Sequence, residues 1–229
     1  MVAVRIYVEG GGDQRATLAE CRRGFSEFFR KVVPGRSPRV VPCGGRNAAF
    51  DRFRTALCDG GDATPLLLVD SEAPVAPAAV AASPASANAA DTSRGGQHAD
   101  TAGRTAWDHL KRADGWERPA GASDEAAHLM VQCMEAWLLA DRDALARFYG
   151  QGFHAGALPG QADVEAIAKQ DVLGALAKAT RGTKTKGEYH KTRHGFDLLA
   201  LVDPGRVVGA SRHARRLVET IAELAVRAP

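Results

Sequence analysis

A chain of 229 residues with 45% hydrophobic residues can form one large globular domain, or one domain with a helical extension. No uncharged apolar run reaches membrane-spanning length and no secretory signal is visible, so we expect a cytoplasmic protein whose four cysteines are reduced. The formal net charge is +3, but the residues from Lys178 onward carry 11 Lys or Arg against 5 Asp or Glu, which favours either a polyanion-binding surface or a solvated basic helix.

The first part of the chain alternates predicted strands and helices. Residues 2–8 have the alternation and β-branched composition of a strand, and residues 15–33 place apolar side chains at helical spacing. Residues 39–45 predict a second short strand, and the helix that follows is expected to be capped by Asn47. Residues 64–72, TPLLLVDSE, form the continuous apolar run of a strand buried on both faces. This order predicts an α/β fold with a parallel sheet flanked by helices.

The second part of the chain is predicted to be helical. Residues 73–104, rich in Ala, Pro and Ser, indicate a flexible insertion. From Ser123 onward apolar residues recur at helical spacing, with His128, Gln132 and Glu135 on the opposite, polar strip. Further helices are expected from Asp141 to Gly150, over residues 163–180 and over residues 211–226. We therefore expect an α/β core in residues 1–122 and a helical part packed on it in residues 123–229.

Carboxylates stand at the ends of the first and third predicted strands. Glu9 ends the first strand, while Asp70 and Glu72 end the third, where the alternation of a strand points both side chains to one side. Ligands collect beyond the carboxyl ends of parallel strands, so these three acids are expected to converge. Like charges that close repel each other, and burial forces protonation unless a divalent cation lies among them. Mg²⁺ or Mn²⁺ prefers such oxygen ligands, and the hypothesis fails if lysine or arginine neutralises the acids instead.

Three glycines follow Glu9 directly. Gly10, Gly11 and Gly12 permit positive φ and let backbone N–H groups approach a phosphate closely. Asp13, the next residue, is either an acid that supports the metal from behind or the N-cap of the following helix. Glycine-rich turns after strands are common, so it is the combination with the strand-end acids that indicates a phosphate-handling site.

The segments VEGGGD and LLLVDSE resemble the Toprim domain of topoisomerases, primases and OLD-type nucleases. In that domain a glutamate follows the first strand and a DxD motif follows the third. By this resemblance Glu9 is the Toprim glutamate, Asp70 is the first acid of DxD, and Glu72 stands in place of its second Asp. OLD-type nucleases use further acids for a second metal, and Glu135 in MEAW is the candidate for that role. Asp141 is a candidate supporting acid, which reaches the same metal only if the helix breaks after Glu135.

A wider set of segments, including CGGRNAAFDRF, HLMVQCMEAWLLADRDAL, FYGQGF and YHKTRHGFDLL, is similar to a Toprim-like bacterial family of unknown function, domain of unknown function 4276. The likeness covers nearly the whole chain apart from the Ala/Pro-rich insertion. It implies a Toprim-like, Rossmann-like and mostly parallel sheet flanked by helices, with a C-terminal helical extension.

A basic loop at residues 181–195 provides candidate contacts to phosphates. Lys191 is the expected catalytic cation, which would offset charge on a scissile phosphate, and Lys169 is a second candidate that would support the site. Arg46, just before a predicted helix, is expected to meet an anion at the helix start or to pair with an acid. The other expected phosphate contacts in the loop are Lys184, Lys186, His190 and Arg193. A surface loop without chemistry explains these residues equally well.

Together these features predict a Mg²⁺- or Mn²⁺-dependent nuclease that cleaves phosphodiester bonds, with DNA favoured over RNA. Toprim nucleases often act with ABC- or AAA-type ATPases, and this chain has no GxxxxGK[ST] loop of its own. The resemblance therefore implies a separate ATPase subunit, in an anti-phage defence pair, and leaves a homo-oligomer open. Two alternatives remain: a non-catalytic module that binds nucleotide or nucleic acid and regulates an ATPase, and a phosphatase or phosphotransferase for a small phosphate ester.

Overall fold

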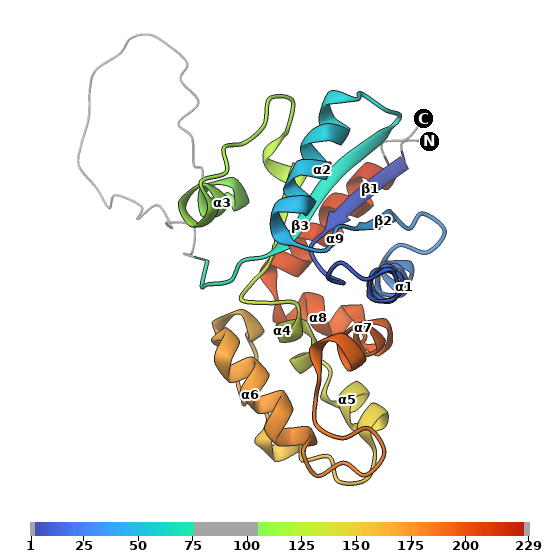
Figure 1. The fold of residues 1–229 in the computed structure, drawn as a ribbon, viewed down its shortest axis with the longest axis vertical. Coiled ribbons are helices and arrows are strands. Elements are labelled where there is room, and N and C mark those ends of the chain that lie inside the picture. Colours follow the sequence, from blue (N-terminus) through green and yellow to red (C-terminus); the bar gives the residue numbers. More distant parts are fainter. Residues whose placement is uncertain (1–2, 76–104, 227–229) are drawn as a thin grey trace, which may run out of the picture.

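A computed structural model describes residues 3–75 and 105–226, so residues 76–104 of the predicted insertion lie outside the described residues. Four strands form one parallel sheet in the order β2–β1–β3–β4 (Figure 1). They are β1 (Ala3–Val8), β2 (Arg39–Pro42), β3 (Ala63–Asp70) and β4 (Ala127–Met130). A parallel sheet flanked by helices confirms the predicted α/β, Rossmann-like fold class.

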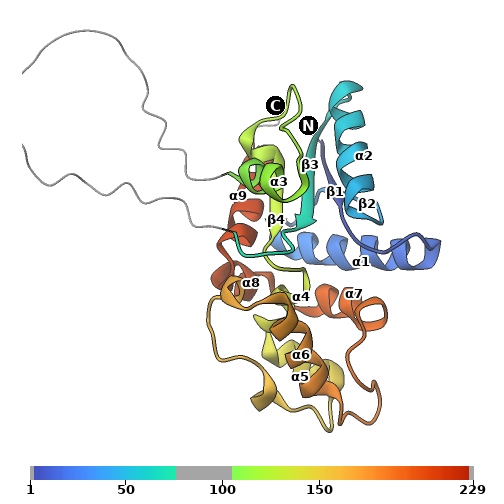
Figure 2. The same cartoon turned by 60° about the vertical axis from the view of Figure 1, so that its left-hand side comes forward.

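The helices cover both faces of the sheet and also form a lobe beyond its carboxyl edge (Figures 1 and 2). Helices α1 and α9 cover one face, α2 and α3 cover the other, and α4 to α8 lie in or beside the lobe. Their bounds are α1 (Arg15–Val32), α2 (Arg46–Cys58), α3 (Ala106–Asp114), α4 (Glu135–Leu139), α5 (Arg142–Tyr149), α6 (Lys169–Thr180), α7 (Lys191–Leu201), α8 (Pro204–Ala210) and α9 (Arg212–Val226). Short 3₁₀ turns occur at Asp124–Ala126, Ala155–Ala157 and Val164–Ala166.

Each face of the sheet has its own hydrophobic core. Ile6 of β1 and Leu68 of β3 lie, together with Phe28 of α1, in the core beneath α1 and α9. Their sequence neighbours Tyr7 and Leu67 lie in the core beneath α2 and α3. The two central strands are therefore buried on both faces, which explains the continuous apolar run that predicted β3.

The prediction of a continuous helix from Ser123 onward is wrong. The chain instead forms β4 at Ala127–Met130, and α4 begins only at Glu135. Every residue of β4 is buried, because one face of this strand meets each core, so no alternation marks it as a strand. The α/β core thus extends into the part that was predicted to be helical. His128, Gln132 and Glu135, expected on a polar strip, are all buried.

Three predicted helix starts also differ. Gly45, not Asn47, is the N-cap of α2, and Gln14, not Asp13, is the N-cap of α1. The helix predicted over residues 163–180 is interrupted, since a 3₁₀ turn precedes α6. Tertiary contacts hold this interruption, because Glu165 in the 3₁₀ turn accepts hydrogen bonds from Ser211 Oγ at 2.6 Å and His213 N at 2.8 Å, at the start of α9.

The packing of α1 on α7 leaves no room for a side chain at Gly24, where an added Cβ would lie 2.7 Å from Phe196 O. We expect Gly24→Ala to lower the free energy of unfolding by about 1–3 kcal/mol, because overpacking forces the helices apart. Gly174→Ala in α6 is the matched control, since an added Cβ there meets nothing within 4 Å. The control is expected to raise the same free energy by about 0.5–1 kcal/mol. Urea unfolding measures both values, and a neutral Gly24→Ala would contradict this packing.

Candidate metal centre

The candidate site lies at the topological switch point of the sheet, where the chain changes the side of β1 on which it adds the next strand. The chain passes from β1 to β2 on one side of β1, and then returns to β3 on its other side. Ligands of parallel α/β sheets bind at such a switch point, beyond the carboxyl ends of the central strands. Glu9 follows β1 there and donates its backbone N–H to Leu68 O at 3.0 Å, while Asp70 is the last residue of β3.

Glu9, Asp70 and Glu72 converge at this edge. One carboxylate oxygen from each lies within 4.8 Å of the other two. The strand alternation that suggested a common direction for Asp70 and Glu72 does not apply, since β3 ends at Asp70 and Glu72 has a left-handed φ of 61°. A turn directs Glu72 instead, and Ser71 Oγ ties this turn to the segment after β4 by accepting from Gln132 N at 2.8 Å.

Backbone donors orient the two central carboxylates. Glu9 Oε2 accepts a hydrogen bond from Asp70 N at 3.1 Å, and Asp70 Oδ1 accepts from Met134 N at 2.8 Å. These backbone bonds use Glu9 Oε2 and Asp70 Oδ1, while Asp70 Oδ2 faces Lys191 Nζ at 3.8 Å. In metal-binding carboxylates, one oxygen is typically oriented by a hydrogen bond and the other oxygen binds the metal.

Each of the three acids also has a basic neighbour. The pairs are Glu9 with Arg46 (3.3 Å), Glu72 with Lys169, and Asp70 with Lys191 (3.8 Å). These contacts do not cancel the negative charge, because Arg46 is also paired with Asp114 and Lys191 also faces Glu135 at 3.5 Å. Five carboxylates thus share three basic side chains, which leaves a formal surplus of two negative charges. One divalent cation would balance this surplus.

Burial changes the proton affinity of these groups. Burial raises the pKa of Asp70 to about 8, against the opposing effect of Lys191 and with the help of Glu9 and Glu135. Burial also raises the pKa of Glu9, although Arg46 and the N–H of Asp70 oppose it. For Lys191, burial acts to lower the pKa, but the carboxylates of Glu135 and Asp70 raise it above its ordinary value. A proton on Asp70 therefore relieves the repulsion that a divalent cation would otherwise relieve.

Glu135 is fully buried at the start of α4 and lies outside the cluster of three acids. Its Oε1 accepts a hydrogen bond from Tyr189 OH at 3.2 Å and lies 3.5 Å from Lys191 Nζ. Its Oε2 has no hydrogen-bond partner among the described residues. The ammonium of Lys191 thus lies between the carboxylates of Glu135 and Asp70 and is shared by them. We interpret Glu135 as the counter-charge that holds Lys191 beside Asp70. The second-metal role that the resemblance implied stays a prediction.

A pocket of about 200 Å³ opens beside the carboxylates. The glycine turn forms one wall, with positive φ at Gly10, Gly11 and Gly12. Gly10 exchanges two backbone hydrogen bonds with Gly44, and a Cβ on Gly11 would lie 2.9 Å from Thr17 O. The turn therefore packs against Gly44 and α1, and its positive φ values favour glycine at all three positions. The other lining residues are Glu9, Phe25, Gly44, Asp70, Met134, Lys191, Thr192 and Phe196.

Other residues predicted to belong to the site lie apart from the acids. Asp141 caps α5 by accepting from Ala144 N at 3.0 Å, and its second oxygen accepts from Asp203 N at 2.9 Å, so it joins α5 to α8. Asp13 is exposed and lies beside the Gly44 turn. The predicted phosphate contacts of the loop and of the first turn of α7 are all exposed: Lys184, Lys186, His190 and Arg193.

The sequence prediction missed two residues that bind the neighbours of the clustered acids rather than the acids themselves. Asp114, at the end of α3, binds Arg46 through both oxygens, although the two residues are 68 positions apart. Tyr189, which donates to Glu135 Oε1, lies 54 positions from it along the chain. No local pattern marks such partners, because their contacts form only when α3 and α7 pack against the sheet and α4.

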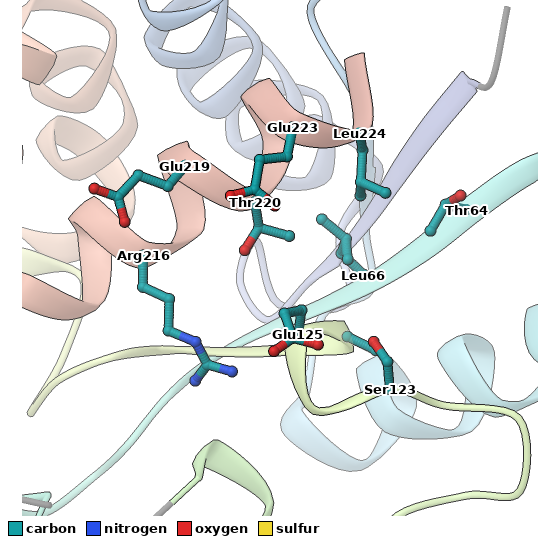
Figure 3. Close-up of a pocket in the computed structure, with 10 residues that line it drawn as sticks. Thr64, Leu66, Ser123, Glu125, Arg216, Glu219, Thr220, Glu223 and Leu224 are labelled. Carbon is teal, nitrogen blue, oxygen red and sulfur yellow. The ribbon is translucent and has the colours of Figure 1, made fainter. Parts of the chain in front are cut away.

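A larger pocket of about 480 Å³ lies at the opposite, amino end of the sheet. Figure 3 shows Arg216 and Thr220 of α9 extending toward Glu125 and toward Leu66 near the start of β3. Neither the clustered acids nor the glycine turn lines this pocket. The smaller pocket is therefore the functional candidate.

The fold and the site define an α/β protein with a Rossmann-like parallel sheet and three clustered carboxylates at its switch point. Residues 8–222 match the model of the Domain of unknown function (DUF4276), and the chain belongs to this family. The match includes every residue of the site described above. No curated protein and no solved structure matches the chain. Among the described residues, none of the helices has the length and apolar character needed to cross a membrane.

Lys169→Met is expected to tighten the binding of Mn²⁺ by up to about fivefold, because Glu72 would lose the ammonium that competes with the cation. The gain is limited because the pair is partly exposed, and such pairs contribute at most about 1 kcal/mol. Titration calorimetry measures the affinity, with Lys178→Met near the other end of α6 as an unchanged control. Weaker binding by Lys169→Met would mean that Lys169 supports the site rather than competing for it.

The affinity for Mn²⁺ is expected to rise with pH between about 6 and 8. Because the pKa of Asp70 is about 8, the metal-free protein is protonated there below that pH, and the cation must displace the proton. Affinity then falls about tenfold for each pH unit below 8. Calorimetry in two buffers of different ionisation enthalpy counts the released proton, about one per cation at pH 7. A pH-independent affinity without proton release would contradict the raised pKa of Asp70.

Proposed function

We propose that this chain is a divalent-cation-dependent nuclease that cleaves phosphodiester bonds in nucleic acid. The observation that carries the proposal is the convergence of Glu9, Asp70 and Glu72, with carboxylate oxygens within 4.8 Å of one another. Mg²⁺ or Mn²⁺ fits these residues because hard cations take oxygen ligands and because the local formal charge is negative by two. When bound, such a cation polarises a phosphoryl oxygen and lowers the pKa of a bound water.

The residues of the chain divide the remaining work. Glu9, Asp70 and Glu72 hold the cation, and Lys191, which lines the same pocket, offsets negative charge on the scissile phosphate. Glu135 keeps the ammonium of Lys191 in place through the 3.5 Å contact. Gly11 and Gly12 would approach the phosphate oxygens from the other side of the pocket, since the N–H of Gly10 is already donated to Gly44 O.

A polymeric substrate is favoured over a small phosphate ester by exposed basic side chains on the segment that leads from α6 to Lys191 and into α7. Lys184, Lys186 and Arg193 lie on the loop before α7 and in its first turn, and Lys191 begins the same helix. Such side chains bind the phosphate backbone without reading its sequence. The resemblance to the Toprim domain of OLD-type nucleases supports DNA as the polymer and a separate ABC- or AAA-type ATPase, in anti-phage defence, as the partner.

A second candidate function is a non-catalytic module that binds nucleic acid or nucleotide and regulates its ATPase. The salt bridge between Lys169 and Glu72 favours it, because Glu72 already has a counter-charge. Glu72 also departs from the second aspartate of DxD. The module would need the basic loop and the glycine turn but no cation.

The test is cleavage of plasmid DNA, single-stranded DNA and RNA by the purified chain with Mn²⁺, with and without its ATPase. Asp70→Asn is expected to reduce the cleavage rate by at least about 1000-fold, because it removes a ligand, and to leave binding of DNA unchanged. Lys191→Met is expected to reduce the rate about 100- to 1000-fold when both proteins are saturated with Mn²⁺.

Asp59→Asn, at the exposed end of α2, is the matched control and should cleave like the unmodified chain. Tight, cation-independent binding of DNA without cleavage would instead support the regulatory module. Turnover of a nucleotide while plasmid DNA stays whole would support a phosphatase.

A further inference from the structure

Arg46 was expected either to meet an anion at the helix start or to pair with an acid, and all three nitrogens of its guanidinium donate to protein groups. Nε and Nη2 donate to the two carboxylate oxygens of Asp114 at 2.7 and 2.6 Å. Nη1 donates to Glu9 Oε2 at 3.3 Å and to the backbone carbonyl of Asp70. The first residue of α2 therefore contacts two of the three clustered acids from the side opposite the helical lobe.

A further contact, with an aromatic ring, restrains the plane of the guanidinium. It lies over the ring of Trp116, with its central carbon 5.1 Å from the ring centroid, and Trp116 stacks on Phe50 at 4.3 Å with an interplanar angle of 3°. Only 15% of the Arg46 side chain is accessible. A forked carboxylate pair and an aromatic face together hold an arginine in one orientation, which a lysine cannot reproduce.

Glu9 needs such a support, because its own segment provides little. It stands between the end of β1 and three successive glycines, so the residues that follow it have no side chains to pack against it. Its Oε2 has two donors among the described residues, Asp70 N and Arg46 Nη1. The contact with Arg46 is the side-chain contact that restrains the carboxylate.

We propose that the Asp114–Arg46 pair, stacked on Trp116, is a positioning device that orients Glu9 toward Asp70 and Glu72 for cation binding. The inference rests on the proposed function, since it concerns the same cation. It assigns a role to α3, whose last residue is Asp114. Arg46 acts through Glu9 and touches neither cation nor substrate.

The test measures Mn²⁺ affinity by titration calorimetry and thermal stability without cation. Arg46→Lys keeps the positive charge but loses the two-pronged pair of hydrogen bonds to Asp114. Asp114→Asn keeps the shape of the side chain but loses the negative charge that holds the guanidinium. Each is expected to weaken Mn²⁺ binding about 10- to 100-fold, the range found when the partners of metal ligands are removed. Asp108→Ala is the matched control, because Asp108 forms the capping box of α3 with Thr105 and is not a partner of Arg46. This control should change the Mn²⁺ affinity less than about twofold.

A double-mutant cycle shows whether the device acts through Glu9. In a Glu9→Gln background, Asp114→Asn is expected to change the residual affinity less than about twofold. An equal loss in both backgrounds, or the same loss with Asp108→Ala, would overturn the inference while leaving the cation site intact. If the unmodified chain binds no Mn²⁺, the proposed function and this inference both fall. Unchanged affinity in Arg46→Lys and Asp114→Asn would overturn the inference alone.

Discussion

The structure depends on the burial of a carboxylate, Asp70, at the end of a parallel strand and beside two other acids. A buried acid is stable only as a protonated group, in an ion pair or as a ligand of a cation. Lys191 provides part of the charge, but this lysine is shared with Glu135. Burial raises the pKa of Asp70, the neighbouring acids raise it further, and the group therefore retains a proton when no cation replaces it.

The two halves of the molecule hold the acids from opposite sides. From the sheet side, Arg46 of α2 restrains Glu9, and it is held in turn by Asp114 of α3. From the lobe side, Lys169 of α6 and Lys191 of α7 contact Glu72 and Asp70. Any movement of the lobe relative to the sheet would therefore change the charge around the acids, which links packing far from the pocket to the chemistry within it.

Local sequence patterns predicted the parts of the site that lie at strand ends. β1 and β3 are apolar runs with an acid at the end, and the rule that parallel strands present their carboxyl ends together brings Glu9 and Asp70 to one place. Glu72 was placed correctly for the wrong reason, since a turn with positive φ, and not strand alternation, directs it. β4 was mistaken for a helix because a strand buried on both faces carries no alternation.

The sequence by itself determined the α/β fold class and two of the three acids at the switch point, because strand pattern and strand ends are local properties. Only the tertiary structure decided which charges compensate these acids. Asp114, Glu135 and Lys191 come from helices far apart in the chain, and Glu135 lies on a segment whose fold was predicted wrongly. The reason is physical: a carboxylate has no preferred partner in the sequence, and its proton or cation affinity is set by burial and by the charges that packing brings within a few ångströms.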